Sequence, residues 1–412
     1  MRHSFRSLAC AAILTFTLGA EASAAGPYQV TATVETRIGP LVRTESTIQA
    51  GAHLLDRFKM VQVRREGQSA SRGTILFLPP LGTTFAFYEQ RDPDGALGTA
   101  ISEFFALRGY DVWGYSPRFE GIPAGTCEAG VLDCSIMGTW NLTSMVEDVT
   151  FIRSQIESAR PGTRIVTGGA SLGGILALAV ANAHPEDYDG IIVWEGLLST
   201  PDPAVRALNQ AYCAAGEAQL AAGAVYDGVG GNVFQMVTKL SHQTPGGLTP
   251  IPLFPPTLTN HQVLVALLST PAPGPITGPV PNYIQMNGSV AEDRLFFADE
   301  RRVYENVVGR FVSYAPTVVA RDVSCSLAGS DTTHVSNLGS YHGSVLAIGG
   351  GRGFGPYMDD QLAQIGSPDE TLLLTPQFGH IDHFMTPRHR WYVERPILRW
   401  MEELFGGEEQ AR

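Results

Sequence analysis

The chain has 412 residues, a formal net charge of −12 and a hydrophobic content of 44%. An acidic chain without any Lys/Arg-rich stretch disfavours nucleic-acid binding, because phosphate recognition needs concentrated positive charge. The length and hydrophobic content suit one large α/β domain, or such a domain with an insertion.

Residues 1–24 have the features of a secretory signal peptide. A basic start precedes an apolar run over residues 7–20, and Ala22-Ser23-Ala24 matches a cleavage site of the A-x-A type. The apolar run is too short to span a bilayer, and no later segment has the ~20 uninterrupted apolar residues that a transmembrane helix requires. We therefore expect a mature chain that begins at Ala25, is secreted or periplasmic, and has no transmembrane segment.

Four cysteines lie beyond the predicted signal peptide: Cys127, Cys134, Cys213 and Cys325. An even number in an oxidising compartment predicts two disulfides, and several pairings are possible. The pair Cys127–Cys134 would close a short local loop and leave Cys213–Cys325 as a long-range link. The chain has no C-x-x-C motif, so we expect no metal site.

Short strands and amphipathic helices alternate through the first half of the chain. A first strand over 28–36 alternates polar and apolar residues, as an edge strand does. The elements that follow are strands at 59–63 and 74–78, a helix at 101–107, a strand at 111–115, a helix at 145–156, a strand at 164–166, a helix at 175–181 and a strand at 190–194. This alternation predicts a largely parallel sheet with helices on both faces.

The alternation stops after residue 196, where periodicity weakens and Pro-rich segments appear. It resumes with a strand at 344–348, a helix at 357–365, a strand at 371–374 and a helix at 397–405. The sequence therefore predicts a core built from residues 25–196 and 341–412, interrupted by a cap or lid insertion over residues 197–340.

Ser171 lies between a predicted strand and a predicted helix, in the sequence Gly169-Ala170-Ser171-Leu172-Gly173. G-x-S-x-G at such a junction is typical of a nucleophile elbow, a tight turn that exposes a serine hydroxyl. The start of the helix directs backbone N–H groups and the positive end of its dipole toward the same place. This combination suits a serine nucleophile for acyl transfer.

The order of these parts resembles the α/β-hydrolase superfamily, in particular its lipases and esterases. The resemblance covers residues 28–194 and 344–405, with the insertion where such enzymes carry a lid. It implies an α/β-hydrolase fold, with a mostly parallel central sheet flanked by helices. It also implies a serine esterase that needs no cofactor and acts on a small-molecule or lipid-like ester.

The same resemblance implies a base histidine after the last strand and an acid between the nucleophile and the base. His380 is the expected base, and His383 is the alternative. The loop after strand 344–348, where relatives usually carry the acid, contains glycines and no carboxylate. We therefore expect Glu195 to be the acid, with Asp359 or Asp360 as the alternative.

The oxyanion hole is expected to combine the N–H of Leu172 with that of Leu81 or Gly82. Pro79 and Pro80 precede this pair and have no N–H group to donate. The expected reaction is hydrolysis of a carboxylic ester through an acyl-enzyme. A peptidase or amidase with the same triad, or a non-catalytic α/β-hydrolase-like binding protein, is the alternative.

Overall fold

The computed structural model describes residues 28–269 and 295–406. The predicted signal peptide, residues 1–24, therefore lies outside the described residues. Among the helices that are described, none is both long and apolar enough to cross a bilayer.

A nine-stranded sheet forms the centre of the molecule, with strand order β1-β2-β3-β5-β4-β6-β7-β10-β11. The strands β1, β2, β3 and β5 pair antiparallel to one another, and every pair from β5 to β11 is parallel. Their bounds are β1 (Gln29–Ile38), β2 (Leu41–Gln49), β3 (Arg57–Arg65), β4 (Thr74–Leu78), β5 (Asp111–Ser116), β6 (Ile165–Ala170), β7 (Gly190–Trp194), β10 (Ser344–Gly350) and β11 (Glu370–Thr375). The prediction of a largely parallel central sheet is confirmed.

One strand of this sheet, β2, was not predicted from the sequence. Its middle, Arg43-Thr44-Glu45-Ser46, is polar and has no apolar alternation. The strand forms because β1 and β3 pair with it on both sides. Tertiary pairing here overrides a weak local pattern.

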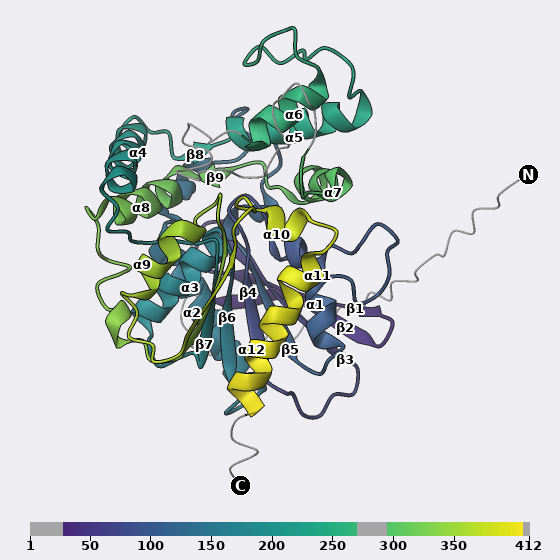
Figure 1. Cartoon of the computed structure of the whole chain (residues 1–412), viewed down its shortest axis with the longest axis vertical. Helices are drawn as coiled ribbons and strands as arrows, with labels where there is room; N and C mark the ends of the chain where they lie inside the picture. The colour runs from purple at the N-terminus through teal and green to yellow at the C-terminus, as the bar shows by residue number, and fades with distance from the viewer. Residues whose placement is uncertain (1–27, 270–294, 407–412) are drawn as a thin grey trace, which may run out of the picture.

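Helices cover both faces of the sheet (Figure 1). The buried strands contribute alternate residues to two separate cores, so that Ile191 and Val193 pack on one side and Ile192 and Trp194 on the other. The first core contains α2 (Leu142–Ala159), α3 (Leu172–Ala183) and α9 (Met358–Leu362), and the second contains α1 (Ile101–Ala106) and α12 (Glu394–Gly406). Helices on both faces explain why strands β4 to β7 and β10 are buried along their whole length and largely apolar.

The segment between β7 and β10 folds into helices that the sequence pattern did not reveal. They are α4 (Pro203–Ala221), α5 (Val229–Gln243), α6 (Asn260–Ser269), α7 (Glu300–Arg310) and α8 (Thr317–Ala328), with a small sheet of β8 (Tyr226–Asp227) and β9 (Ala315–Pro316). In Figure 1 these elements lie above the edge of the sheet at which the parallel strands end. This is the edge at which open α/β sheets bind ligands.

Short elements complete the fold. Two helices of one turn, α10 (Asp382–Met385) and α11 (His389–Tyr392), connect β11 to α12. Among the described residues, 3-10 helices in the connections are η1 (Phe85–Glu89), η2 (Arg118–Gly121), η3 (Cys134–Thr139), η5 (Leu338–Ser340) and η6 (Gly355–Tyr357).

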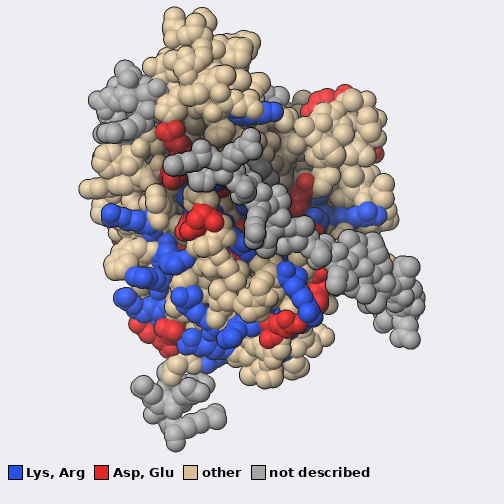
Figure 2. Space-filling model, turned by 90° about the vertical axis from the view of Figure 1, so that its right-hand side faces the viewer, with Lys and Arg blue, Asp and Glu red and all other residues tan. Residues whose placement is uncertain are grey.

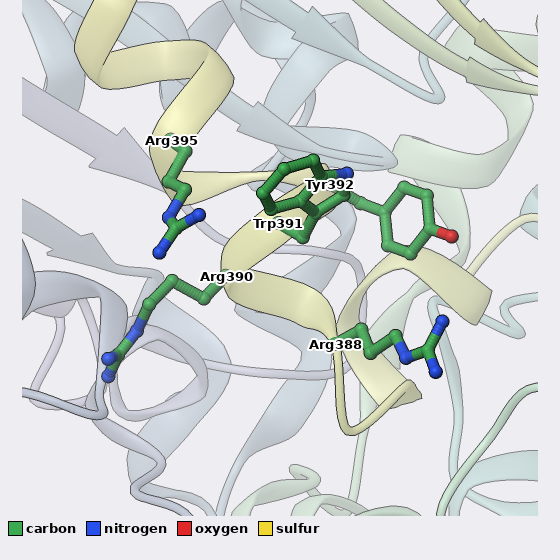
Figure 3. Close-up of a pocket in the computed structure, with 5 residues that line it drawn as sticks. All are labelled: Arg388, Arg390, Trp391, Tyr392 and Arg395. Atoms are coloured by element: carbon green, nitrogen blue, oxygen red, sulfur yellow. The ribbon is translucent and has the colours of Figure 1, made fainter.

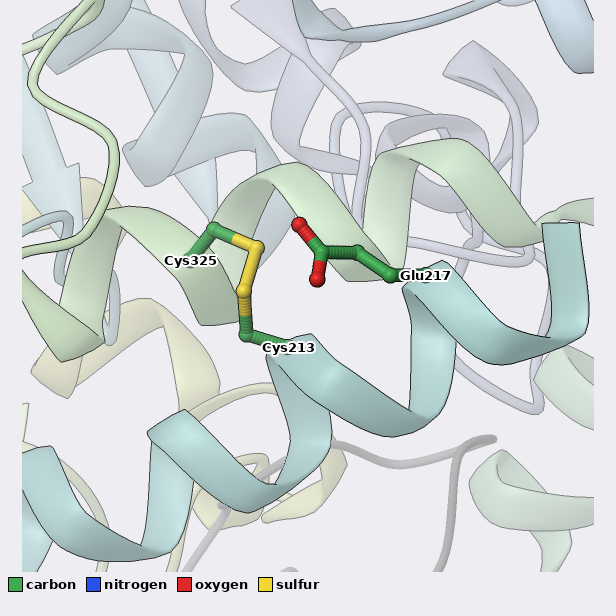
Figure 4. Close-up of side chains that lie close together, drawn as sticks. All are labelled: Cys213, Glu217 and Cys325. Atoms are coloured by element: carbon green, nitrogen blue, oxygen red, sulfur yellow. A yellow bond between two sulfur atoms is a disulfide. The ribbon is translucent and has the colours of Figure 1, made fainter. Parts of the chain in front are cut away.

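The four described cysteines pair as Cys127–Cys134 and Cys213–Cys325. The second disulfide joins α4 to α8, and Glu217 lies beside it (Figure 4). The two sulfur atoms and one Glu217 oxygen lie within 4.8 Å of one another, a spacing that suits a metal ion. Metal binding needs free thiolates, however, and the disulfide uses both sulfur atoms.

Candidate active site

Ser171 lies in a strained turn between β6 and α3. Its backbone has φ 55° and ψ −119°, a combination that residues with a side chain rarely adopt. Two hydrogen bonds hold the turn: Ser171 N donates to Trp194 O over 2.7 Å, and Ile175 N donates to Ser171 O over 3.0 Å. Strain of this kind persists only where the surroundings enforce it, and it is concentrated at functional sites.

Two glycines allow this turn to pack against the end of β4. A Cβ atom at Gly169 or at Gly173 would come within 2.0 Å of the carbonyl oxygen of Leu78. The elbow motif is therefore a packing requirement here, because any larger residue would separate the serine turn from the loop after β4.

Glu195 is the second residue with a side chain and a positive φ, at 51°, and the described residues contain no third. It follows β7 directly, just as Ser171 follows β6. The two strands are adjacent, and Ala170 is paired with Trp194. Ser171 and Glu195 therefore leave neighbouring strands at the same level of the sheet.

The Glu195 carboxylate is fully buried and receives three polar contacts. Gly350 N and Phe354 N donate to its two oxygens, the latter over 2.8 Å, and Nδ1 of His380 lies 2.9 Å from Oε2. Burial of an unpaired carboxylate would be costly, and these partners offset that cost.

The glycine-rich loop after β10 makes room for this carboxylate. A Cβ atom at Gly353 would lie 2.2 Å from Oε2 of Glu195. The end of β10 and the loop after it, which contain no carboxylate, thus surround Glu195, and their backbone supplies two of its three contacts. This is the physical reason for the departure of this loop from the usual pattern.

His380 is buried in the turn between β11 and α10. The ring of Phe354 meets the imidazole edge-on, with 5.2 Å between the ring centres. A carboxylate at Nδ1 favours the tautomer that carries its proton there, which leaves Nε2 as the basic nitrogen. Of the expected acids, the structure places Glu195 against this histidine.

The other candidate residues occupy different positions. His383 is buried, its Nε2 lies 3.1 Å from Oγ1 of Thr375, and burial together with the nearby His380 lowers its pKa to about 3. Asp359 and Asp360 lie in the first turn of α9, where Asp359 is exposed to solvent. His383 therefore has the surroundings of a residue that packs in the core. Asp359 and Asp360 have those of acidic residues that stabilise the start of a helix.

Asp382 stabilises the turn that carries His380. Its carboxylate is buried and accepts a hydrogen bond of 2.6 Å from Gly379 N, the residue before His380. The carboxylate therefore restrains the backbone that carries the imidazole.

The expected oxyanion donors lie at the start of α3 and in the turn after β4. Leu172 is the first residue of α3, so its N–H has no acceptor within the helix. Gly82 has φ 78°, and its carbonyl accepts a hydrogen bond of 2.8 Å from Val312 N. The segment between β7 and β10 thus holds the turn that contains Leu81 and Gly82, which is the expected oxyanion turn.

Tyr88 is a residue of the candidate site that the sequence analysis did not identify. It is fully buried, its hydroxyl donates to Leu78 O over 2.6 Å, and it accepts from Ala170 N over 3.1 Å. Burial raises its pKa well above the ordinary value, so the phenol remains a donor. Tyr88 joins the ends of β4 and β6, the two strands that lead into the expected oxyanion turn and the serine turn. A tyrosine in a loop carries no local signal of such a contact.

No family model matches the chain, and no curated protein does. Solved structures do match it. A candidate lipase from Sulfolobus solfataricus aligns with a TM-score of 0.62 at 14% identity, over 90% of this chain and 99% of that one. A lipase in an open form aligns with a TM-score of 0.50 at 12% identity, over 86% and 97%. Together with the mostly parallel sheet, these matches show that the chain has the α/β-hydrolase fold.

Proposed function

We propose that this protein is a serine hydrolase that cleaves carboxylic esters, with Ser171 as nucleophile, His380 as base and Glu195 as acid. The observation that carries the proposal is the Glu195–His380 contact of 2.9 Å, made beside a strained serine turn. An isolated elbow motif would be weak support, but a buried carboxylate–imidazole pair next to it is the arrangement that activates a serine.

The reaction begins when Oγ of Ser171 attacks the ester carbonyl carbon and Nε2 of His380 takes the hydroxyl proton. Glu195 stabilises the imidazolium ion, and the N–H groups of Leu172 and of Leu81 or Gly82 bind the oxyanion. The bond to the alcohol oxygen breaks as His380 returns the proton to it. Water then attacks the acyl-enzyme, gives one proton to His380 and releases the acid, and the proton returns to Ser171. The proposal requires no cofactor and no metal ion.

The insertion over residues 197–340 is proposed as a cap that shapes the acyl or alcohol pocket. Support comes from its place above the strand ends in Figure 1, and from the bond of Val312 N to the oxyanion turn. We propose that the core comprises residues 25–196 and 341–412, and that residues 1–24 direct export. The two disulfides agree with a secreted or periplasmic location, where such bonds persist.

The test compares p-nitrophenyl ester hydrolysis by the wild type, by Ser171→Ala and by the matched control Ser154→Ala. Ser154 is exposed on α2, so its variant should keep wild-type activity. Ser171→Ala should lose about a thousandfold or more in kcat. A fluorophosphonate probe should label the wild type and the control but not Ser171→Ala. Equal ester turnover by all three proteins would refute the serine mechanism.

Ester and amide preference is measured on the same proteins. A panel of matched p-nitrophenyl esters and p-nitroanilides should show turnover of the esters. Faster cleavage of the anilides would instead assign the same triad to a peptidase or amidase.

A further inference from the structure

Arginines and an exposed tryptophan lie together at the surface around α11. Four of its five tryptophans are buried, whereas the side chain of Trp391 is 64% exposed. Arg388, Arg390, Trp391, Tyr392 and Arg395 together line a shallow pocket of about 390 Å³ (Figure 3). An exposed tryptophan among arginines needs an explanation, because hydrophobic burial ordinarily removes such a ring from water.

A further arginine, Arg108 in the turn after α1, extends this surface. The guanidinium of Arg108 lies over the Phe104 ring, 3.5 Å from its centre, and that of Arg390 lies 5.7 Å from the same centre. Burial and the positive charges of Arg390 and Arg395 lower the pKa of Arg108, against an opposing effect of Glu402. We call Arg108, Arg388, Arg390, Arg395 and Trp391 the arginine patch.

The charge of the patch is not neutralised by ion pairs within the described part of the chain. Arg390 donates to Gly98 O and Arg108 to Phe104 O, both neutral backbone acceptors. Arg395 lies 5.1 Å above the ring of Trp391. Figure 2 shows Lys and Arg side chains over the lower part of one face, with Asp and Glu side chains among them, although the chain as a whole carries a net charge of −12.

The arrangement of the side chains indicates the kind of partner. In Figure 3, Arg388 extends to one side of Trp391, and Arg390 and Arg395 lie on the other side. The guanidinium groups therefore do not converge on a single small anion. They border an exposed aromatic ring, as at a protein surface that contacts a plane of charged headgroups.

We propose that the arginine patch docks the protein onto an anionic lipid surface, with Trp391 in the headgroup layer and the arginines against lipid phosphates. Each basic residue near such a surface adds attraction, and the remaining acidic surface is repelled, so the patch also sets the orientation of the protein. This proposal does not depend on the proposed hydrolase activity, because docking requires neither Ser171 nor His380.

The test is flotation of the full chain with vesicles of phosphatidylcholine alone and with vesicles that also contain phosphatidylglycerol. Wild type should bind the anionic vesicles, bind the neutral ones far less, and dissociate as salt is added. A triple variant, Arg388→Gln with Arg390→Gln and Arg395→Gln, should partition at least about tenfold more weakly. The matched control replaces Arg206, Lys239 and Arg301 by Gln, which removes three exposed cations from α4, α5 and α7 instead. It should bind as wild type does.

Tryptophan fluorescence gives a second measurement on the same samples. Because the other four tryptophans are buried, a blue shift on addition of anionic vesicles reports Trp391. The Trp391→Phe variant should lose this shift while it keeps the wild-type thermal unfolding midpoint. Equal partitioning of the triple variant and the wild type, or no preference for anionic vesicles, would overturn the proposal. Patch-dependent binding to a DNA duplex without vesicle binding would overturn it as well.

Discussion

The contact between Glu195 and His380 leads to a quantitative prediction for Glu195→Gln. The native carboxylate accepts from Gly350 N, from Phe354 N and from the imidazole, and it has no hydrogen to donate. A glutamine of the same shape has one oxygen and one NH₂ group. Whichever way the amide is turned, its NH₂ faces at least one N–H donor.

The cost of this mismatch can be estimated from the contacts. If the NH₂ faces Phe354 and His380, the imidazole must give up its Nδ1 proton, and the wrong tautomer costs about 10⁴ in kcat in a comparable triad. If it faces Gly350, the site loses a charge-assisted hydrogen bond and leaves a buried donor unpaired, which costs about 1.5–3 kcal/mol of folding free energy. In the first orientation we expect kcat to fall by about 10³–10⁴, and in the second by less, because the tautomer is kept and only the charge that stabilises the imidazolium ion is lost; KM should change little in either.

The assay is steady-state hydrolysis of a soluble p-nitrophenyl ester, together with urea unfolding of each variant. Asp359→Asn and Asp360→Asn are the controls, because both residues lie in the first turn of α9 and not against His380. They should keep kcat within about twofold, as expected for surface changes. Near-wild-type kcat in folded Glu195→Gln, with a large loss in either aspartate variant, would show that the acid is misassigned.

Three further predictions concern the surroundings of the site. Tyr88→Phe removes the hydroxyl between Leu78 O and Ala170 N. We expect kcat to fall by about tenfold or more with KM nearly unchanged. An unaltered kcat would show that this hydroxyl does not position the oxyanion turn. Replacement of Cys213 and Cys325 by Ser should lower the unfolding free energy by about 2–5 kcal/mol, measured by urea titration, because the disulfide closes a loop across 112 residues of sequence; the same stability with and without the bond would contradict this. His383 stays neutral in the folded protein down to about pH 3, whereas in the unfolded chain it takes up a proton near pH 6.5. Its contribution to stability is therefore complete above pH 6.5 and declines by up to about 1.4 kcal/mol per pH unit as the pH falls from there toward 3. His383→Gln should show a shallower loss of stability between about pH 6 and pH 4 than the wild type, and parallel curves would refute the assignment.

Much of the fold is local and could be predicted from the sequence. Apolar runs of strand length and amphipathic helices are encoded by residues close in sequence, so the alternation that includes β4, β5, β6 and β7 was predictable. The polar strand β2 was missed because only its neighbours make it a strand. The helices between β7 and β10 were missed because their apolar residues show only weak periodicity in the sequence.

The candidate site also has features that the sequence predicts and features that need the tertiary structure. The sequence by itself determined the elbow around Ser171 and a histidine turn after the last strand, because each is a short motif with its own backbone requirement. It could only rank the acids, since a carboxylate is chosen by what surrounds it in space. The tertiary structure placed Glu195 against His380, 185 residues further along the chain, and closed the loop after β10 around it. It also gathered Arg108 from the turn after α1 with the arginines of α11 and α12, which no local pattern predicts. Hydrophobic periodicity depends on residues that are close in sequence, so the sequence shows it directly. Contacts between distant segments depend on the order of the strands in the sheet, which only the tertiary structure decides.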